Sequence, residues 1–331
     1  MSPIELKPKD LRSNQEIRWC PGCGDYAVLN ATQQALAEIG VPKEQIMIVS
    51  GIGCSSRFPY YMDTYGFHSI HGRALAFATG IKTANPDLSV WVATGDGDAM
   101  SIGGNHLIHA LRRNVNVKIL MFNNEIYGLT KGQYSPTSPK GKKTKTSPFG
   151  SVDHPFHPIE LALGAGATFV ARTMDTQPKH MKKVLLAAAA HKGAAFVEIW
   201  QNCVIFNNGA FKDWTAKDNR AEHTVDMVPG EPLVFGADRD KGLMVDCHGT
   251  NIVSPADATV WDPSTPTPVP GFLMADLDRY DDLPRAIGIF RDVATETYED
   301  AIHRQVDRVI DSKGPGTLKN LLYTSDTWTV D

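Results

Sequence analysis

Residues 88–124 read LSVWVATGDGDAMSIGGNHLIHALRRNVNVKILMFNN, and this stretch decides the fold. Its two apolar runs, 88–94 and 117–122, are predicted strands, and residues 101–113 between them carry apolar side chains at helical spacing. A strand, a helix and a second strand in this order predict a right-handed crossover between two parallel strands. The chain should therefore belong to the α/β fold class, with a parallel sheet flanked by helices.

Polar motifs follow both predicted strands. Gly-Asp-Gly occupies residues 95–97 and Asn-Asn occupies residues 123–124, with 25 residues between them. Parallel strands present their carboxyl ends at one edge of the sheet, where ligands of open α/β sheets bind, so the two motifs should meet there. Mg²⁺ takes about six oxygen ligands from protein groups, phosphates and water. The predicted protein ligands are the Asp96 carboxylate, the Asn124 side-chain oxygen and the Ile126 carbonyl, with a diphosphate and a water completing the set.

Each half of this magnesium-diphosphate site also has a simpler interpretation. A Gly-Asp-Gly turn after a strand is common, and paired asparagines often end a strand. Taken alone, the two motifs are equally compatible with a cofactor site and with ordinary strand ends.

The cysteines form a second set of candidate ligands. Cys20 and Cys23 make a C-x2-C pair in CPGCG, whereas Cys54 and Cys203 are single and distant in sequence. A structural zinc ribbon normally has a second C-x2-C pair, and this sequence has none. Four thiolates without a fixed spacing suit a 4Fe-4S cluster. The alternative is that Cys54 and Cys203 are small buried side chains, since free cysteine is often buried.

The two sets of residues together resemble the β subunits of the 2-oxoacid:ferredoxin oxidoreductases, and most of all those that act on 2-oxoglutarate. The motifs of that family occur here in the same order over residues 14–210: CPGCG, GIGCSSR, HGRALAFATGIK, GDGD, NNEIYGLTKGQYSPTS and a late single cysteine. The fold that the resemblance implies is the diphosphate-binding half of a thiamine-diphosphate enzyme, followed by a C-terminal arm.

The resemblance implies a cofactor for each set of residues. The 4Fe-4S ligands would be Cys20, Cys23, Cys54 and Cys203, and the Mg²⁺ ligands would be Asp96, Asn124 and Ile126. Further residues expected to contact the cofactors are Ser55, His71, Gly95, Gly97 and Asp98.

Two residues are predicted to act in catalysis. Lys131 follows the second metal motif closely enough for its ammonium group to reach the carboxylate of a bound 2-oxoacid, although most lysines are solvated surface groups. His71, at a predicted helix start, could contact the diphosphate or position the substrate, although a helix-capping or core histidine is about as common.

The implied reaction is oxidative decarboxylation of 2-oxoglutarate with coenzyme A to succinyl-CoA and CO2, with electrons passing to ferredoxin and reversal possible in principle. Residues 127–138 (YGLTKGQYSPTS) resemble family members that act on 2-oxoglutarate or on a broad range of 2-oxoacids. A dicarboxylate needs two cationic or donor-rich sites, and Lys131 would provide one. Pyruvate or a broader 2-oxoacid range is the alternative. A thiamine-dependent decarboxylase without electron transfer and a zinc-stabilised interaction subunit are more remote alternatives.

One required group is not found in the sequence. Thiamine enzymes need a carboxylate beside the aminopyrimidine ring, usually a Glu from a pyrimidine-binding domain, and no segment here matches that domain. The resemblance therefore implies an α subunit that supplies this Glu, in an αβ or (αβ)2 assembly.

Composition restricts the remaining possibilities. With 331 residues, 42% of them apolar, the chain can bury a full core, and we predict a cofactor domain at 14–209 and a C-terminal extension at 210–331 that packs on the core or on a partner. A net charge of −4 argues against nucleic-acid binding. No apolar stretch of 18 residues and no apolar signal core are present, so we expect a cytoplasmic protein with no membrane association. Five cysteines, an odd number, suit reduced thiols or metal ligands, and Cys247 has no predicted partner.

Residues 131–156 are rich in Pro, Gly, Ser and Lys and predict a long loop, a kind of segment that is usually functional or mobile. Its four lysines are either solvated groups or a positive field for coenzyme A or an acidic ferredoxin. These lysines are Lys140, Lys142, Lys143 and Lys145. Further predicted helices are 28–39, 72–83, 178–191 and 293–311, and further strands are 46–50, 168–172 and 194–200.

Overall fold

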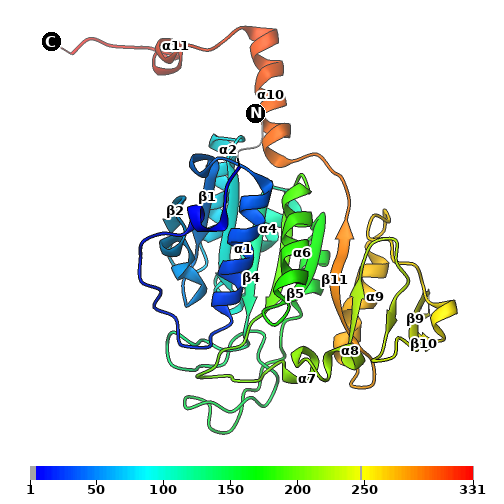
Figure 1. Cartoon of the computed structure of the whole chain (residues 1–331). Helices are drawn as coiled ribbons and strands as arrows, with labels where there is room; N and C mark the ends of the chain where they lie inside the picture. Colours follow the sequence, from blue (N-terminus) through cyan, green and yellow to red (C-terminus); the bar gives the residue numbers. More distant parts are fainter. Residues whose placement is uncertain (1–4, 247, 331) are drawn as a thin grey trace.

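The computed structural model describes residues 5–246 and 248–330. Its main sheet has eight strands in the order β2-β1-β3-β4-β6-β5-β11-β7 (Figure 1). Neighbouring strands from β2 to β5 pair in parallel, β11 is antiparallel to β5, and β7 is parallel to β11. The predicted parallel sheet flanked by helices is thus confirmed. The strands are β1 (Ile46–Ser50), β2 (Tyr65–His68), β3 (Ser89–Gly95), β4 (Val117–Asn123), β5 (Phe169–Met174), β6 (Ala195–Trp200), β7 (Thr224–Met227) and β11 (Arg285–Asp292).

The central strand β4 shows why apolar runs form this sheet. All of its residues are buried. Ile119 and Met121 belong to the hydrophobic core on one face of the sheet, and Leu120 and Phe122 belong to the core on the other face. Because alternate side chains of a strand point to opposite faces, a strand covered on both faces must be apolar at every position.

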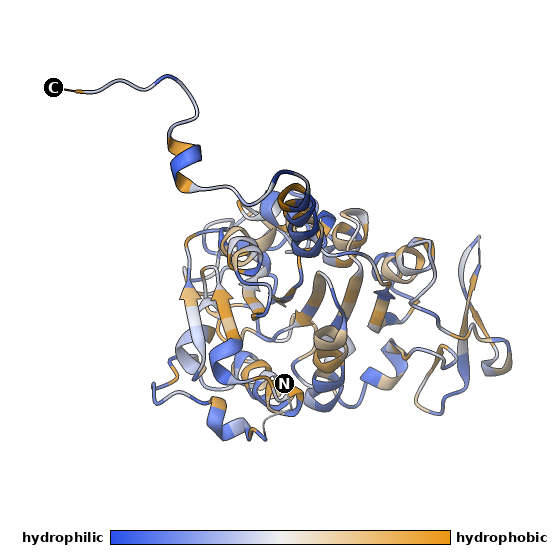
Figure 2. Ribbon diagram, turned by 90° about the horizontal axis from the view of Figure 1, so that it is seen from above, coloured by the Kyte–Doolittle hydropathy of each residue, from blue (hydrophilic) through white to orange (hydrophobic). Residues whose placement is uncertain are grey.

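Helices cover both faces of the sheet. On one face α1 packs against α6, and on the other α2 contacts α4, which contacts α5. Seen from above, the strands are coloured mainly as hydrophobic and the outer sides of the helices as hydrophilic (Figure 2). These helices are α1 (Asp25–Ile39), α2 (Ala74–Ala84), α4 (Gly104–Arg112), α5 (Pro158–Gly164) and α6 (Pro178–Ala190).

The helix predicted at 101–113 corresponds to α4, which starts at Gly104, and a turn separates it from a short helix that was not predicted, α3 (Asp96–Met100). The turn brings Gly103 against Gly72, so closely that a Cβ atom on Gly72 would lie 2.4 Å from the Gly103 nitrogen. The left-handed φ of +64° at Gly72 also delays the start of α2 to Ala74, two residues later than predicted. The loop before α2 is therefore held beside α3.

The chain after residue 209 contributes strands to the main sheet, which the sequence did not lead us to predict. Both β7 and β11 come from this region, while β8, β9 and β10 form a separate antiparallel sheet. The division of domains at residue 210 stays a prediction, but hydrogen bonds of the sheet cross it. The other elements are η1 (Pro8–Leu11), η2 (Lys43–Gln45), η3 (Ser55–Tyr61), α7 (Lys212–Thr215), α8 (Arg220–His223), β8 (Val234–Phe235), β9 (Lys241–Asp246), β10 (Gly249–Val253), η4 (Pro255–Asp257), α9 (Val269–Asp276) and η5 (Leu277–Arg279).

The chain ends in two helices, α10 (Tyr298–Lys313) and α11 (Leu318–Leu322), that lead away from the body of the protein (Figure 1). The helix predicted from residue 293 starts at Tyr298, because the Thr297 side chain accepts a hydrogen bond from the Asp300 amide and caps it. Cys247 lies outside the described residues. Within them, no helix is both long enough and apolar enough to span a membrane.

Arg172 on β5 connects the sheet to the chain after residue 209. It is 1% exposed, and its guanidinium donates to Glu198 at 2.7 Å and to Asp278 at 2.6 Å. Replacing Arg172 by Met would leave two carboxylates without their cation, so we expect the free energy of unfolding to fall by about 3–5 kcal/mol in urea titrations.

The matched control for Arg172→Met is Arg279→Met. Arg279 also pairs with two carboxylates, those of Glu160 and Asp276, but its side chain is 45% exposed. Exposed ion pairs contribute about 0–1 kcal/mol. If the two substitutions had equal costs, the buried pairs would not stabilise the connection.

Candidate active site

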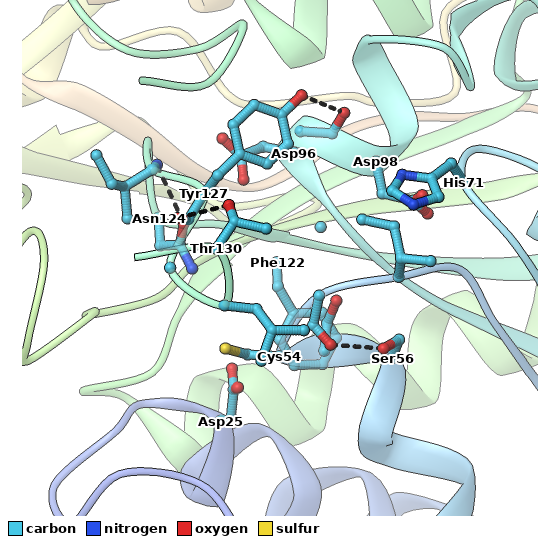
Figure 3. Close-up of a pocket in the computed structure, with 18 of the residues that line it drawn as sticks. Asp25, Cys54, Ser56, His71, Asp96, Asp98, Phe122, Asn124, Tyr127 and Thr130 are labelled. Atoms are coloured by element: carbon cyan, nitrogen blue, oxygen red, sulfur yellow. Dashed lines mark hydrogen bonds between the residues drawn. The ribbon is translucent and has the colours of Figure 1, made fainter. Parts of the chain in front are cut away.

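The carboxyl ends of β3 and β4 lie side by side, since Gly95 pairs with Phe122, and a cavity of about 290 Å³ opens at this edge (Figure 3). Asp96, Asp98 and His71 lie on one side of it, and Cys54 and Asp25 lie on the other. Every residue predicted to bind thiamine diphosphate or Mg²⁺ lines this cavity. These residues are Ser55, His71, Gly95, Asp96, Gly97, Asp98, Asn124 and Ile126.

Asp96 is a buried carboxylate whose side-chain partners are hydroxyl groups. Its Oδ2 accepts hydrogen bonds from Ser135 Oγ and Thr137 Oγ1, both at 2.5 Å. Burial raises the pKa of Asp96, and these hydrogen bonds oppose the rise. The ion pairs of the described part of the chain do not include Asp96. A buried carboxylate without a cation is costly, so the site fits a bound metal ion.

The two asparagines after β4 point to different places. The Asn123 amide donates to Glu198 at 2.7 Å inside the sheet, whereas Asn124 lines the cavity. Asn124 Oδ1 accepts from the Ile126 amide at 3.2 Å, and Asn124 Nδ2 donates to Gln201 Oε1 at 2.7 Å. The residue predicted as a metal ligand is thus the one at the cavity, on the same edge as Asp96.

Asp98 holds the loops around the cavity. Its Oδ1 accepts from the Gly72 amide at 2.7 Å and its Oδ2 from Thr94 Oγ1 at 2.8 Å. A Cβ atom on Gly51 would lie 1.6 Å from Asp98 Oδ2, so only glycine fits there. Burial raises the pKa of Asp98. Because Asp98 fixes the backbone next to His71, it positions the exposed His71 side chain at the cavity.

The four predicted cluster cysteines surround a second cavity of about 210 Å³. They are Cys20, Cys23, Cys54 and Cys203. A Cβ atom on Gly128 would lie 3.3 Å from Cys203 Sγ and 3.9 Å from Cys54 Sγ, so this glycine allows the two thiols to approach. No three His, Cys, Asp or Glu side chains in residues 5–246 and 248–330 are grouped to hold one metal ion. The thiols instead border a space much larger than a single ion needs.

The two cavities adjoin. Cys54, Gly128 and Leu129 line both of them. Burial raises the pKa of the Cys54 thiol to about 12 and also raises that of Cys23, and the charge of nearby Asp25 adds to both shifts. Bound metal ions reverse such shifts, because a coordinating thiol is deprotonated outright. The placement of four thiols around one cavity fits a metal cluster, whose positive irons would replace the protons.

Asp25 was not predicted as a site residue, although it follows CPGCG directly. It is 1% exposed, and its Oδ2 has no hydrogen-bond partner among the described residues. Burial raises the pKa of Asp25 to about 7, with a hydrogen bond from Cys23 opposing the rise. Asp25 lines the first cavity and interacts with the cysteines, so it lies between the two predicted cofactors.

Lys131 lines the cysteine cavity, where Arg18 and Arg57 also lie, and it is not among the residues lining the Asp96 cavity. Its φ of +76° is left-handed, which is rare for a residue with a side chain. Its predicted contact with a substrate carboxylate stays a prediction. Of the loop lysines, Lys142 is half-buried and donates to Asn207 Oδ1, while the other three are exposed.

Comparison with known proteins places these features in a family. The profile "Thiamine pyrophosphate enzyme, C-terminal TPP binding domain" matches residues 51–199. A 2-oxoglutarate oxidoreductase subunit KorB of Mycobacterium tuberculosis is 53% identical over 98% of this chain and 89% of its own length. A 2-oxoglutarate synthase subunit KorB of Archaeoglobus fulgidus is 49% identical over 56% of this chain and 69% of its own length.

A solved structure agrees with these sequence matches. The 2-oxoglutarate:ferredoxin oxidoreductase from Magnetococcus marinus, solved with 2-oxoglutarate, coenzyme A and succinyl-CoA bound, superposes with a TM-score of 0.78 at 33% identity. The match covers 98% of this chain and 97% of that one. The thiamine-binding profile, the matched length of the relatives and the shared fold agree, and the chain belongs to the family of 2-oxoacid:ferredoxin oxidoreductase β subunits.

Proposed function

We propose that this chain is the β subunit of a 2-oxoglutarate:ferredoxin oxidoreductase, which converts 2-oxoglutarate and coenzyme A to succinyl-CoA and CO2 and passes the electrons to ferredoxin. The observation that carries the proposal is the shared wall of the two cavities, where Cys54 borders both the Asp96 site and the cysteine site. The names of the relatives from Mycobacterium tuberculosis and Archaeoglobus fulgidus support 2-oxoglutarate as the substrate.

In this proposal the residues of the first cavity hold Mg²⁺ and thiamine diphosphate. Asp96, Asn124 and the Ile126 carbonyl bind the metal, and Ser135 and Thr137 keep the Asp96 carboxylate in place. Asp98 holds the backbone that leads to His71, which contacts the diphosphate or the substrate. When bound, thiamine diphosphate supplies the carbanion and the electron sink for removing CO2 from a 2-oxoacid.

The cysteine cavity holds the 4Fe-4S cluster, ligated by Cys20, Cys23, Cys54 and Cys203. Because Cys54 lines both cavities, it would hold the cluster next to the first cavity, where the cluster would supply an electron acceptor. Arg18, Arg57 and Lys131 line this cavity and would offset the negative charge of a thiolate-bound cluster. A cytoplasmic location is part of the proposal, since the thiols must remain reduced.

An α subunit completes the site. The carboxylates that line the first cavity in the described part of the chain are those of Asp25, Asp96 and Asp98, and none is a Glu. We therefore assign the Glu beside the aminopyrimidine to the partner, in an αβ or (αβ)2 assembly. Within this chain, residues 14–209 hold the cofactors, and residues 210–331 pack on the core or the partner.

The proposal is tested by steady-state rates of the anaerobically reconstituted αβ complex with ferredoxin. Reduction of ferredoxin should require both coenzyme A and a 2-oxoacid, and kcat/KM should be highest for 2-oxoglutarate. A kcat/KM for pyruvate equal to that for 2-oxoglutarate would move the assignment to the broad-range members of the family.

Lys131→Ala is expected to raise KM for 2-oxoglutarate roughly tenfold or more, because a hydrogen bond between charged groups contributes about 1.5–3 kcal/mol. If Lys131 binds the carboxylate next to the ketone, which pyruvate also has, KM for pyruvate should rise by the same factor. If Lys131 binds the distal carboxylate, which pyruvate lacks, KM for pyruvate should not change. Lys143→Ala, an exposed lysine of the same loop, is the control. An unchanged KM would remove Lys131 from the substrate site.

A further inference from the structure

Gln201 connects the two cavities. It follows β6 just as Asn124 follows β4, and these parallel strands end in register at the pair Asn123 and Trp200. The Gln201 amide nitrogen continues the ladder by donating to the Asn123 carbonyl at 2.9 Å. The two side chains therefore leave the same edge of the sheet next to each other, and Gln201 is 1% exposed.

The Gln201 side chain bonds to one residue of each predicted cofactor site. Its Oε1 accepts from Asn124 Nδ2 at 2.7 Å. Its Nε2 donates to Cys23 Sγ at 3.3 Å and to the Asn202 carbonyl at 2.6 Å. A single buried amide thus bridges a predicted Mg²⁺ ligand and a predicted cluster ligand.

Backbone groups fix the direction of this bridge. At one end the Ile126 amide donates to Asn124 Oδ1, so Nδ2 of Asn124 must face Gln201. At the other end the Asn202 carbonyl accepts from Gln201, so the Gln201 nitrogen must face Cys23. Neither side-chain amide can turn over without placing two acceptors or two donors against each other. Asn124 therefore presents an oxygen for a cation, and Cys23 receives an N–H.

We propose that Gln201 is a positioning residue that couples the metal site at Asn124 to the cluster site at Cys23. This inference rests on the proposed function, because it requires both cofactors. A cation on the Asn124 oxygen polarises that amide and strengthens its bond to Gln201, which in turn becomes a stronger donor to Cys23, as expected of hydrogen bonds in a chain. Hydrogen bonds to cluster sulfurs help set the reduction potential, and they favour the more negative, reduced state.

The coupling has a reciprocal consequence. If the bound metal cofactor favours the reduced cluster through Gln201, then the reduced cluster favours binding of the cofactor through the same path, by the same factor. The affinity of the complex for thiamine diphosphate and Mg²⁺ should then depend on the redox state of the cluster, and part of that dependence should disappear without the Gln201 amide.

A second contact between the two sites keeps a Gln201 variant assembled. Asn207 Nδ2 donates to the Asn124 carbonyl at 2.8 Å, and the Asn207 amide donates to the Cys203 carbonyl at 3.0 Å. These contacts hold the backbone of both loops and do not involve the Asn124 side chain. Gln201→Met keeps the length of the side chain and removes both polar groups. It should therefore abolish the hydrogen-bond path from Asn124 to Cys23 while both cofactor sites still form.

The experiment uses the αβ complex, with iron, sulfide and thiamine content measured first. The affinity for thiamine diphosphate with Mg²⁺ is determined with oxidised and with reduced cluster, and an EPR-monitored titration gives the midpoint potential. The ratio of the oxidised to the reduced dissociation constant should be about three- to tenfold larger in the wild type than in Gln201→Met, and a tenfold change corresponds to about 59 mV for one electron. Through-space charge effects are common to both proteins and cancel in this comparison.

Asn208→Ala is the matched control, because Asn208 is an exposed amide of the same loop whose contact is with Asn202. It should keep the wild-type ratio. If Gln201→Met keeps that ratio with both cofactors bound, the coupling is overturned and the proposed function stands. If the wild-type complex binds neither iron nor thiamine diphosphate, both fall. If Gln201→Met fails to load a cluster, the same measurement is made on Gln201→Glu, which keeps an acceptor for Asn124 and removes the donor to Cys23. A wild-type ratio of the two dissociation constants in Gln201→Glu would also overturn the coupling.

Discussion

Asp96→Ala is expected to weaken binding of thiamine diphosphate with Mg²⁺ by about thirtyfold to several thousandfold. Asp96 is the one charged Mg²⁺ ligand we assign, and truncating one partner of a buried charge pair costs about 2–5 kcal/mol. Isothermal titration of the αβ complex measures the loss. The apo variant should remain folded, because the carboxylate it lacks is desolvated and its partners, the Ser135 and Thr137 hydroxyls and backbone amides, carry no charge.

The control for Asp96→Ala is Asp153→Ala. Asp153 lies in the same long loop as Ser135 and Thr137, is exposed, and accepts a hydrogen bond from the Tyr134 hydroxyl. Its replacement should leave cofactor affinity unchanged. Wild-type affinity in Asp96→Ala would mean that the metal is bound elsewhere, and that the carboxylate serves only to anchor the loop.

The elements around Asp96 could be predicted because the information is local. Apolar runs before residues 95 and 123 are buried on both faces of a sheet, and parallel connection then places their carboxyl ends together. Asp96 and Asn124 therefore lie on one edge whatever the distant contacts are.

The contacts that complete the site are long-range and could not be predicted in the same way. Ser135 and Thr137 reach Asp96 only because the loop 131–156 folds back over the sheet edge. Gln201 meets Asn124 because β6 lies next to β4, although β5 precedes β6 in the chain. No periodicity in the sequence specifies which strands become neighbours, so residues at the ends of non-consecutive strands were missed.

The strands after residue 209 were missed for a different reason. β7 has four residues, which is too short to show a pattern. β11 contains Gly288 with a φ of +98°, and its pairing with β5 shifts register between Ile289 and Arg291. Such an irregularity interrupts the alternation by which a strand is recognised. Both strands nevertheless belong to the main sheet, and the Asp278 carboxylate, from the same part of the chain, accepts a hydrogen bond from Arg172 on β5.

Lys131 lines the cysteine cavity and not the Asp96 cavity, so it has two possible roles. A lysine beside the cysteine cavity, together with Arg18 and Arg57, places three cations on the cluster side of the shared wall. A substrate carboxylate that reached them would lie between the metal site and the cluster. If Lys131 instead only offsets cluster charge, Lys131→Ala would lower the midpoint potential and leave KM unchanged, so the two measurements together distinguish these roles.

Cys203→Ser is expected to abolish or severely damage the cluster, because a 4Fe-4S cluster uses four thiolates and Cys203 is the most distant in sequence of the four around the cavity. The wild-type complex, purified anaerobically, should contain about four iron and four sulfide per β chain and absorb near 400 nm, and the variant should lose both. Cys247→Ser is the control and should keep the cluster. Full iron and sulfide in Cys203→Ser would refute the fourth ligand.

Zinc in place of iron in the wild type would favour a structural metal site, and a colourless protein that binds thiamine diphosphate would favour a decarboxylase without electron transfer. The adjoining cavities favour the iron cluster, because a purely structural metal would gain nothing from Cys54 bordering the thiamine site.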